Sequence, residues 1–157
     1  MTNSEKMHKI VEMLEQNHIN LYHDVSKQKI QRKIKELDEI VNGLTDIQFD
    51  RQMMELFAMF KDSHTCYEPN LEYKTFDHKF LFVDNNLYLI VDDKPLKVKT
   101  ICGAKVKEIA NKFKKIICCE SNEWLNKCLN DYFNIEPFYK LCEIETDANK
   151  IEVECSN

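Results

Sequence analysis

The chain has 157 residues, a length that argues against more than two domains. Of these residues 43% are hydrophobic and 31% charged, which is an ordinary composition for a globular protein. Only two glycines and three prolines argue against a disordered or loop-rich chain. The net charge of -5 disfavours nucleic acid as a partner, because a phosphate backbone would be repelled unless a basic face were segregated.

The sequence offers only one local basic group, and it contains no membrane-spanning or metal-binding pattern. That group is Lys112, Lys114 and Lys115, and such a run is typical of the solvated side of an element. The seven cysteines are odd in number and include no C-x-x-C pair, which favours reduced thiols over a disulfide framework, a zinc site or a thioredoxin-like motif. We therefore expect no cofactor, no metal and no membrane span. The chain as given reads as cytoplasmic, and its compartment stays open.

Helical spacing of apolar residues predicts three amphipathic helices in residues 1–66, which together imply a small helical bundle. A capping residue precedes each helix: Thr2, Ser26 and Thr45. Glu5 and Gln48 complete two capping boxes, and Gly43 is placed to end the second helix. The apolar stripes are Met7, Ile10, Val11 and Leu14; Ile30, Ile34, Leu37 and Val41; and Met53, Leu56, Phe57 and Phe60.

The pattern changes after Pro69, where residues 67–157 are predicted to form a small mixed subdomain. Residues 79–83 and 87–91 read as a hairpin with its turn at residues 84–86, and residues 98–101 add a third strand. Residues 105–109 alternate as a half-buried strand does, although a helix over residues 106–117 fits the same apolar positions nearly as well; we favour a strand followed by a helix.

Two helices and a strand complete the prediction. Ser121 is the expected cap of a helix over residues 122–133, and Pro137 favours a further short helix that ends at Leu141. A last strand is expected over residues 151–153. The predicted fold class is therefore α+β: a three-helix bundle followed by a mixed subdomain with a short antiparallel sheet.

The tetrapeptide Asp62-Ser63-His64-Thr65 is the segment that best suits chemistry, because it follows the third predicted helix, where side chains can project into a cleft. Imidazole titrates near neutral pH, so His64 could serve as a general base if a neighbour, Ser63 or Asp62, fixed its tautomer. The same residue types also cap helices and form turns, so a purely structural role stays open. His18 and His23 lack the i, i+4 spacing of a metal pair and indicate a turn.

These motifs resemble the front region of C-terminal-processing (tail-specific) and tricorn-like serine peptidases. Residues 62–65 look like the family's Asp-Gly-His-Thr signature, and residues 18–23, His-Ile-Asn-Leu-Tyr-His, are similar to its His-Pro-Asn-Leu-Tyr-His stretch. Residues 44–46, Leu-Thr-Asp, with Phe49 resemble its Leu-Thr-Asp-x-x-Phe helix start. Weaker matches are Gly103 to Val106 and Glu123 to Leu125. The resemblance covers nearly the whole chain.

The resemblance implies that His64 is a candidate general base and that Ser63 supplies the hydroxyl that orients it. These roles apply only within a longer enzyme. The nucleophile and oxyanion hole of the family lie in a later core, and no serine here has a Gly-x-Ser context. Ser63 also stands where the family has glycine, which leaves the local backbone geometry open.

Three functions are compatible with the sequence. The first is the non-catalytic, cleft-framing N-terminal region of such a peptidase, inactive alone, with a peptide or protein substrate or a following peptidase domain as its partner. The second is a stand-alone peptide- or protein-binding module that uses the same cleft or an exposed strand edge. The third is a structural interaction domain without a ligand.

Overall fold

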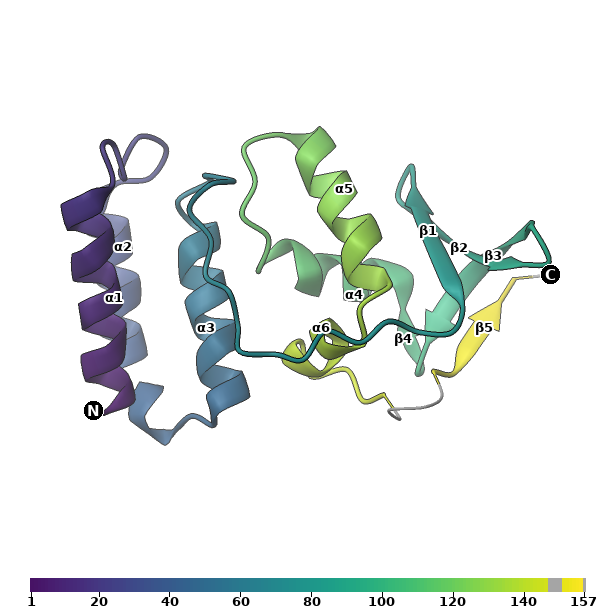
Figure 1. The fold of residues 1–157 in the computed structure, drawn as a ribbon, viewed down its shortest axis with the longest axis horizontal. Helices are drawn as coiled ribbons and strands as arrows, with labels where there is room; N and C mark the ends of the chain where they lie inside the picture. The colour runs from purple at the N-terminus through teal and green to yellow at the C-terminus, as the bar shows by residue number, and fades with distance from the viewer. Residues whose placement is uncertain (147–150, 157) are drawn as a thin grey trace. The chain divides into compact units, whose positions relative to one another are not determined.

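The computed structural model describes residues 1–146 and 151–156 and divides into two units (Figure 1). The first unit is Met1–Pro69 with Cys118–Glu120, and the second is Asn70–Ile117 with Ser121–Asn157. The described residues form six α-helices and a small antiparallel sheet, so the expected α+β class is confirmed. The predicted boundary, residues 1–66 against 67–157, lies close to this division but does not include the return of residues 118–120.

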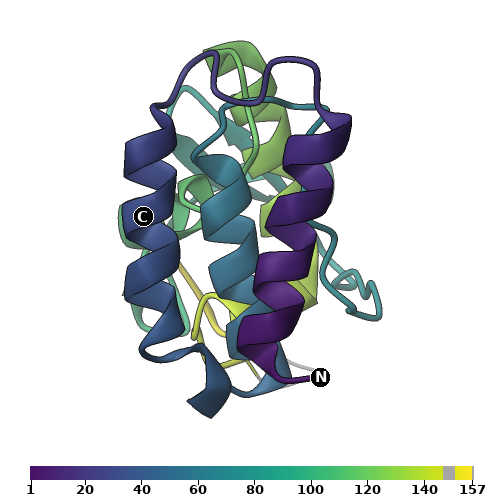
Figure 2. The same cartoon turned by 90° about the vertical axis from the view of Figure 1, so that its left-hand side faces the viewer.

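Three helices of the first unit lie side by side (Figure 2). They are α1 (Asn3–Asn17), α2 (Lys27–Asp38) and α3 (Asp46–Ala58). The predicted caps are present: Thr2 and Glu5, and Thr45 and Gln48, form reciprocal capping boxes, while the Ser26 hydroxyl accepts from the Lys29 N–H. The second helix ends at Asp38, before Gly43, and a 3-10 turn, η1 (Val41–Gly43), follows it.

The apolar stripes of these helices share one hydrophobic cluster. Met7, Ile30, Met53, Leu56 and Phe60 are each 0% exposed. A fully buried side chain of this size contributes about 1.5–3 kcal/mol relative to an exposed one. Burial of the predicted stripes therefore accounts for the packing of this unit.

The second unit contains a five-stranded antiparallel sheet. Its strands are β1 (Lys79–Val83), β2 (Asn86–Val91), β3 (Lys94–Ile101), β4 (Ala104–Lys105) and β5 (Val153–Cys155), in the order β1-β2-β3-β4, with β5 also paired to β3. Asp84 and Asn85 join β1 to β2 with φ of 49° and 61°, and Asp92 and Asp93 join β2 to β3 with φ of 48° and 60°. Two central residues with positive φ are typical of a two-residue hairpin. The second such turn makes β3 longer than the predicted residues 98–101.

The strand predicted over residues 105–109 is wrong, because α4 (Val106–Lys114) occupies this segment. A strand would have placed Ile109 on the same face as Lys105 and Lys107. In the helix, its side chain is instead buried together with those of Val106, Ala110 and Phe113. The last strand also begins later than predicted, at Val153 rather than at residue 151.

Helix α5 (Asn122–Phe133) packs on β1 (Figure 1), and a short helix, α6 (Glu136–Leu141), follows. The expected Ser121 cap is present. The Asn134 side-chain oxygen accepts from the Phe80 N–H at 2.8 Å, and that of Asn130 accepts from the Phe82 N–H at 2.8 Å. Because β1 lies at the end of the sheet order, these amides occupy backbone donors of an edge strand that would otherwise be open to pairing.

None of the helices in the described ranges, 1–146 and 151–156, is both long and apolar enough to cross a membrane.

Candidate functional site

The tetrapeptide at residues 62–65 forms a turn built around the Asp62 carboxylate, directly after α3. Asp62 Oδ1 accepts from the His64 backbone N–H at 2.9 Å, and Oδ2 accepts from the Thr65 hydroxyl at 2.7 Å. The Thr65 N–H also donates to the Asp62 carbonyl at 3.1 Å. Asp62 and Thr65 are both buried. Their side chains therefore close the turn from inside, which is the structural role that the sequence left open.

The ring of His18 links the C-terminal end of α1 to this turn. Its Nε2 lies 2.8 Å from Asp62 Oδ2, although the two residues are far apart in the sequence. The other ring nitrogen, Nδ1, accepts from the Asn20 backbone N–H at 3.0 Å. Because Nδ1 is the acceptor, Nε2 carries the hydrogen that it donates to Asp62. Both nitrogens are engaged, so in this arrangement His18 positions the backbone and has no lone pair to offer a substrate.

The hydrogen bonds around Asp62 hold the pKa of its carboxyl well below the ordinary range. The largest cause is donation from His18, followed by donation from Thr65; burial acts in the opposite direction, and the His64 N–H and Glu120 lower the pKa further. Hydrogen bonds to the charged form of a carboxyl favour that form. Asp62 is therefore an ionised anchor for its neighbours rather than a proton donor.

The two residues predicted from the resemblance, Ser63 and His64, are adjacent in this turn but have different surroundings. The Ser63 N–H and hydroxyl both donate to Glu120 Oε1, at 3.2 and 3.1 Å. His64 is exposed, and within residues 1–146 and 151–156 its ring has no hydrogen bond to Ser63. The structure thus pairs Ser63 with Glu120 rather than with His64. A Ser63–His64 pair acting in a longer enzyme stays a prediction.

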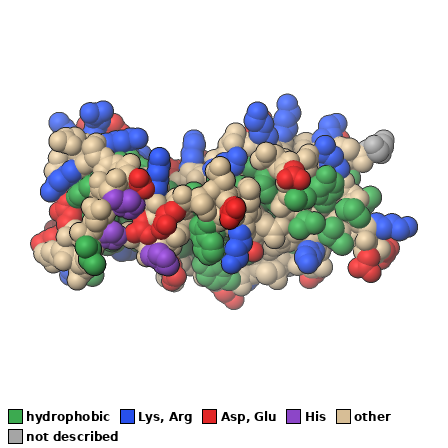
Figure 3. All heavy atoms as spheres, turned by 90° about the horizontal axis from the view of Figure 1, so that it is seen from above, with side chains coloured by type: hydrophobic (Ala, Val, Ile, Leu, Met, Phe, Trp, Pro, Cys, Tyr) green, Lys and Arg blue, Asp and Glu red, His purple; other side chains and the backbone are tan. Residues whose placement is uncertain are grey.

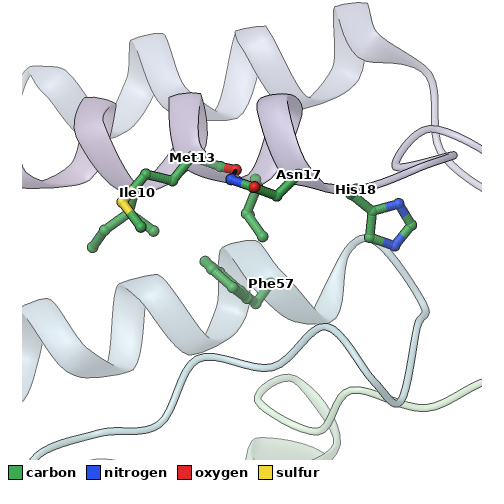
Figure 4. A pocket seen from close by; sticks show the side chains of 6 residues that line it. Ile10, Met13, Asn17, His18 and Phe57 are labelled. Carbon is green, nitrogen blue, oxygen red and sulfur yellow. Dashed lines mark hydrogen bonds between the residues drawn. The ribbon is translucent and has the colours of Figure 1, made fainter.

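An apolar pocket of about 350 Å³ lies between α1 and α3, next to this turn. Figure 4 shows Phe57 extending from α3 towards Ile10 and Met13 of α1, with Asn17 and His18 at the end of α1. Leu14 completes the lining. The volume is at the lower end of the range of roughly 300–1,000 Å³ that is typical of small-ligand sites.

Histidine and acidic side chains gather over the helical unit on the face seen in Figure 3. Three histidines of this unit lie in pairs with acidic side chains: besides His18 with Asp62, His8 Nε2 lies 2.8 Å from Asp38, and His23 Nε2 lies 3.0 Å from Asp24. Among the residues that the structure describes, no group of three or more His, Cys, Asp or Glu side chains is placed to hold a metal ion. The arrangement is suited to orienting backbone and side chains.

Two contacts of the site were missed by sequence reasoning. One is the His18–Asp62 hydrogen bond, and the other is the use of Glu120 by Ser63. A turn formed by Asp62 and Thr65 could have been found from their i, i+3 spacing, since Asp and Thr side chains commonly bond to nearby backbone. Neither His18 nor Glu120 carries a local signal, because both reach the turn only through tertiary packing.

The chain matches no protein-family model, and no curated protein sequence or solved structure is significantly similar to it. The resemblance to C-terminal-processing and tricorn-like serine peptidases therefore rests on the motifs quoted from the sequence.

Proposed function

We propose that this chain is the non-catalytic, substrate-framing N-terminal region of a C-terminal-processing or tricorn-like serine peptidase. In this proposal, α1, α2 and α3 form a three-helix bundle whose pocket holds an apolar side chain of a peptide. Cleavage would require a nucleophile supplied by a further part of such an enzyme.

The hydrogen bond between His18 and Asp62 is the observation that carries the proposal. Each residue opens one of the two segments with the strongest resemblance to the family, residues 18–23 and residues 62–65. The two segments begin 44 residues apart in the sequence, and side chains of their first residues meet at 2.8 Å. Both segments would then shape the same part of the helical unit, which accounts for the presence of both motifs in one chain.

The apolar surface beside this junction supports a peptide as the occupant. Four of the six residues that line the pocket are apolar. Met13 on its rim is 55% exposed, and Ile19, directly after His18, is 103% exposed. Large apolar side chains left in water near a pocket are typical of interaction sites. An apolar side chain of a peptide would cover them, while Asn17 offers a polar group at the same end.

A stand-alone peptide-binding module is the second candidate, and one observation favours the pocket as its site over a strand edge. All residues of the pocket belong to Met1–Pro69. In contrast, the Phe80 and Phe82 N–H groups of edge strand β1 already donate to Asn134 and Asn130. Backbone pairing with an added strand needs free donors and acceptors at the edge. The pocket therefore serves either candidate, whether or not a peptidase core follows.

Peptide binding tests the proposal directly. Fluorescein-labelled peptides that differ only by leucine or serine at one position would be titrated with the full chain, and binding followed by fluorescence anisotropy. Met13→Glu is expected to weaken binding of the leucine peptide by about tenfold or more, because burial of an apolar side chain is worth about 1.5–3 kcal/mol.

Gln16→Glu is the matched control, because it makes the same charge change at an exposed position of α1 that does not line the pocket. It is expected to bind the leucine peptide as the wild type does. Equal affinity for the leucine and serine peptides would contradict the proposal. An unchanged affinity in Met13→Glu would contradict it as well.

A further inference from the structure

Two segments that are distant in the sequence contact each other in the helical unit. The first is the turn at residues 62–67, and the second is Cys118–Glu120, which belongs to this unit although residues of the second unit flank it in the sequence. The Ser63 N–H and hydroxyl hold Glu120 at 3.2 and 3.1 Å. The hydrogen bonds fix the second segment against the turn.

Two thiols face each other where these segments meet. The thiols of Cys66 and Cys118 lie close enough to interact directly, with Cys118 in the position of the donor. Cys66 is exposed, and its Sγ also donates to the Ser63 carbonyl at 3.3 Å. Cys118 is 7% exposed and packs within the hydrophobic cluster of the helices. One thiol is thus accessible, and its partner is held beneath it.

We propose that Cys66 and Cys118 form a redox-active thiol pair in which the exposed Cys66 reacts with low-molecular-weight disulfides and the buried Cys118 resolves the product. The oxidant class is a small disulfide such as glutathione disulfide. The expected modification is an intramolecular Cys66–Cys118 disulfide.

The reaction balances as two exchange steps. The Cys66 thiolate attacks one sulfur of glutathione disulfide, forms a mixed disulfide and releases one glutathione thiolate. Cys118 then gives its proton to water or to that thiolate, attacks the Cys66 sulfur and releases the second glutathione. Two protein thiols are oxidised, and one glutathione disulfide is reduced to two glutathione thiols.

The charges around the pair assign these roles. Hydrogen bonding from Cys118 lowers the pKa of the Cys66 thiol, and burial with the Asp62 and Glu68 carboxylates opposes this. The same hydrogen bond, burial and the negative charge of Cys66 raise the pKa of Cys118. Cys66, which is also the exposed thiol of the two, therefore ionises more readily than Cys118, and the thiolate is the attacking species. Once Cys66 is in a mixed disulfide, its sulfur carries no negative charge. The charge repulsion that helps to raise the pKa of Cys118 is then absent, so Cys118 ionises more readily.

Neighbouring Cys119 is the rival resolving thiol and provides the matched control. It is partly exposed, burial raises the pKa of its thiol, and Lys61 opposes the shift. Cys119 does not share the hydrogen bond with Cys66 that Cys118 makes. Substituting each in turn separates the two candidates, because they differ by one position in the same segment.

The test treats the full reduced chain with glutathione disulfide, blocks the remaining thiols with N-ethylmaleimide, and identifies linked tryptic peptides by mass spectrometry. Trypsin separates Cys66 from Cys118 and Cys119 by cutting after Lys74 and Lys115, among other sites. The wild type and Cys119→Ala are expected to yield the same linked pair of peptides.

Single variants decide the roles. Cys66→Ser is expected to lose the linked peptides and leave Cys118 accessible to N-ethylmaleimide only after unfolding. Cys118→Ala is expected to retain a stable glutathione adduct on Cys66. The proposal is overturned if Cys119→Ala loses the link, if Cys118→Ala still forms it, or if wild-type Cys66 accumulates as the glutathione adduct.

Discussion

Replacing Phe57 with alanine is expected to lower the free energy of unfolding of the helical unit by about 3–5 kcal/mol. The side chain is 5% exposed, and its ring packs edge-on against Phe60 and Tyr67 at centroid distances of 6.3 and 5.8 Å. Truncation removes these contacts and leaves a cavity beside the existing pocket. The loss would be measured by urea unfolding, with hydrogen exchange of the α3 backbone amides as the probe.

Met13→Ala is the matched control for Phe57→Ala, since both residues line the pocket but Met13 is 55% exposed. Its expected effect is within about 0.5 kcal/mol, as is usual for surface substitutions. An equally small effect of Phe57→Ala would contradict the packing described for α3. A large effect of Met13→Ala would contradict its assignment to the rim.

Replacing Asp62 with asparagine is expected to destabilise the helical unit by about 2–3 kcal/mol near neutral pH, because hydrogen bonds to a charged group are worth about 1.5–3 kcal/mol each. The carboxylate accepts from His18, Thr65 and the His64 N–H, and asparagine offers a single acceptor oxygen in its place. The loss would be measured as the shift in the urea midpoint at constant slope.

The effect of Asp62→Asn is expected to depend on pH in a defined direction. The pKa of Asp62 is lowered in the folded chain, whereas an unfolded aspartate has a pKa of about 3.9. The unfolded chain therefore binds the proton more readily, and the stability from this carboxylate is present above that value and lost as pH falls towards the lower folded pKa. The difference between the wild type and the variant should shrink below about pH 4.

Asp24→Asn serves as the control for this pH dependence, because Asp24 is exposed and its carboxylate forms an ion pair with the neighbouring His23. It should have a small effect near neutral pH, since exposed ion pairs are worth about 0–1 kcal/mol. If the difference in unfolding free energy between the wild type and Asp62→Asn stayed constant over the whole acid range, it would contradict the conclusion that Asp62 is ionised in the folded chain.

Local signals predicted the helices and the first hairpin, because their causes lie within a few residues. Thr2 with Glu5, and Thr45 with Gln48, mark helix starts by direct side-chain bonding to backbone N–H groups. At residues 105–109, the strand and the helix fitted the apolar positions nearly equally well, and packing decided between them. The burial of Ile109 and Phe113 on one face is a tertiary outcome that alternation alone does not show.

The site was less predictable than the fold, because its main contacts join distant segments. The sequence predicts Asp62 as a possible partner that orients the ring of His64. In the structure, its carboxylate accepts from the backbone N–H of His64 and from the ring of His18, and it does not bond to the ring of His64. Likewise, the Ser63 hydroxyl donates to Glu120. Neither pairing follows from spacing, since the chain must first fold for these residues to meet.

A hydrolysis assay tests most directly the claim that this chain frames a substrate without cutting it. Casein and the leucine peptide would be incubated with the wild-type chain, Ser63→Ala and His64→Ala, and new amino termini counted. We expect no release above the buffer blank from any of the three proteins, while the wild type still binds the peptide. Hydrolysis by the wild type that either substitution abolishes would contradict it and would make Ser63 and His64 part of a catalytic site within this chain.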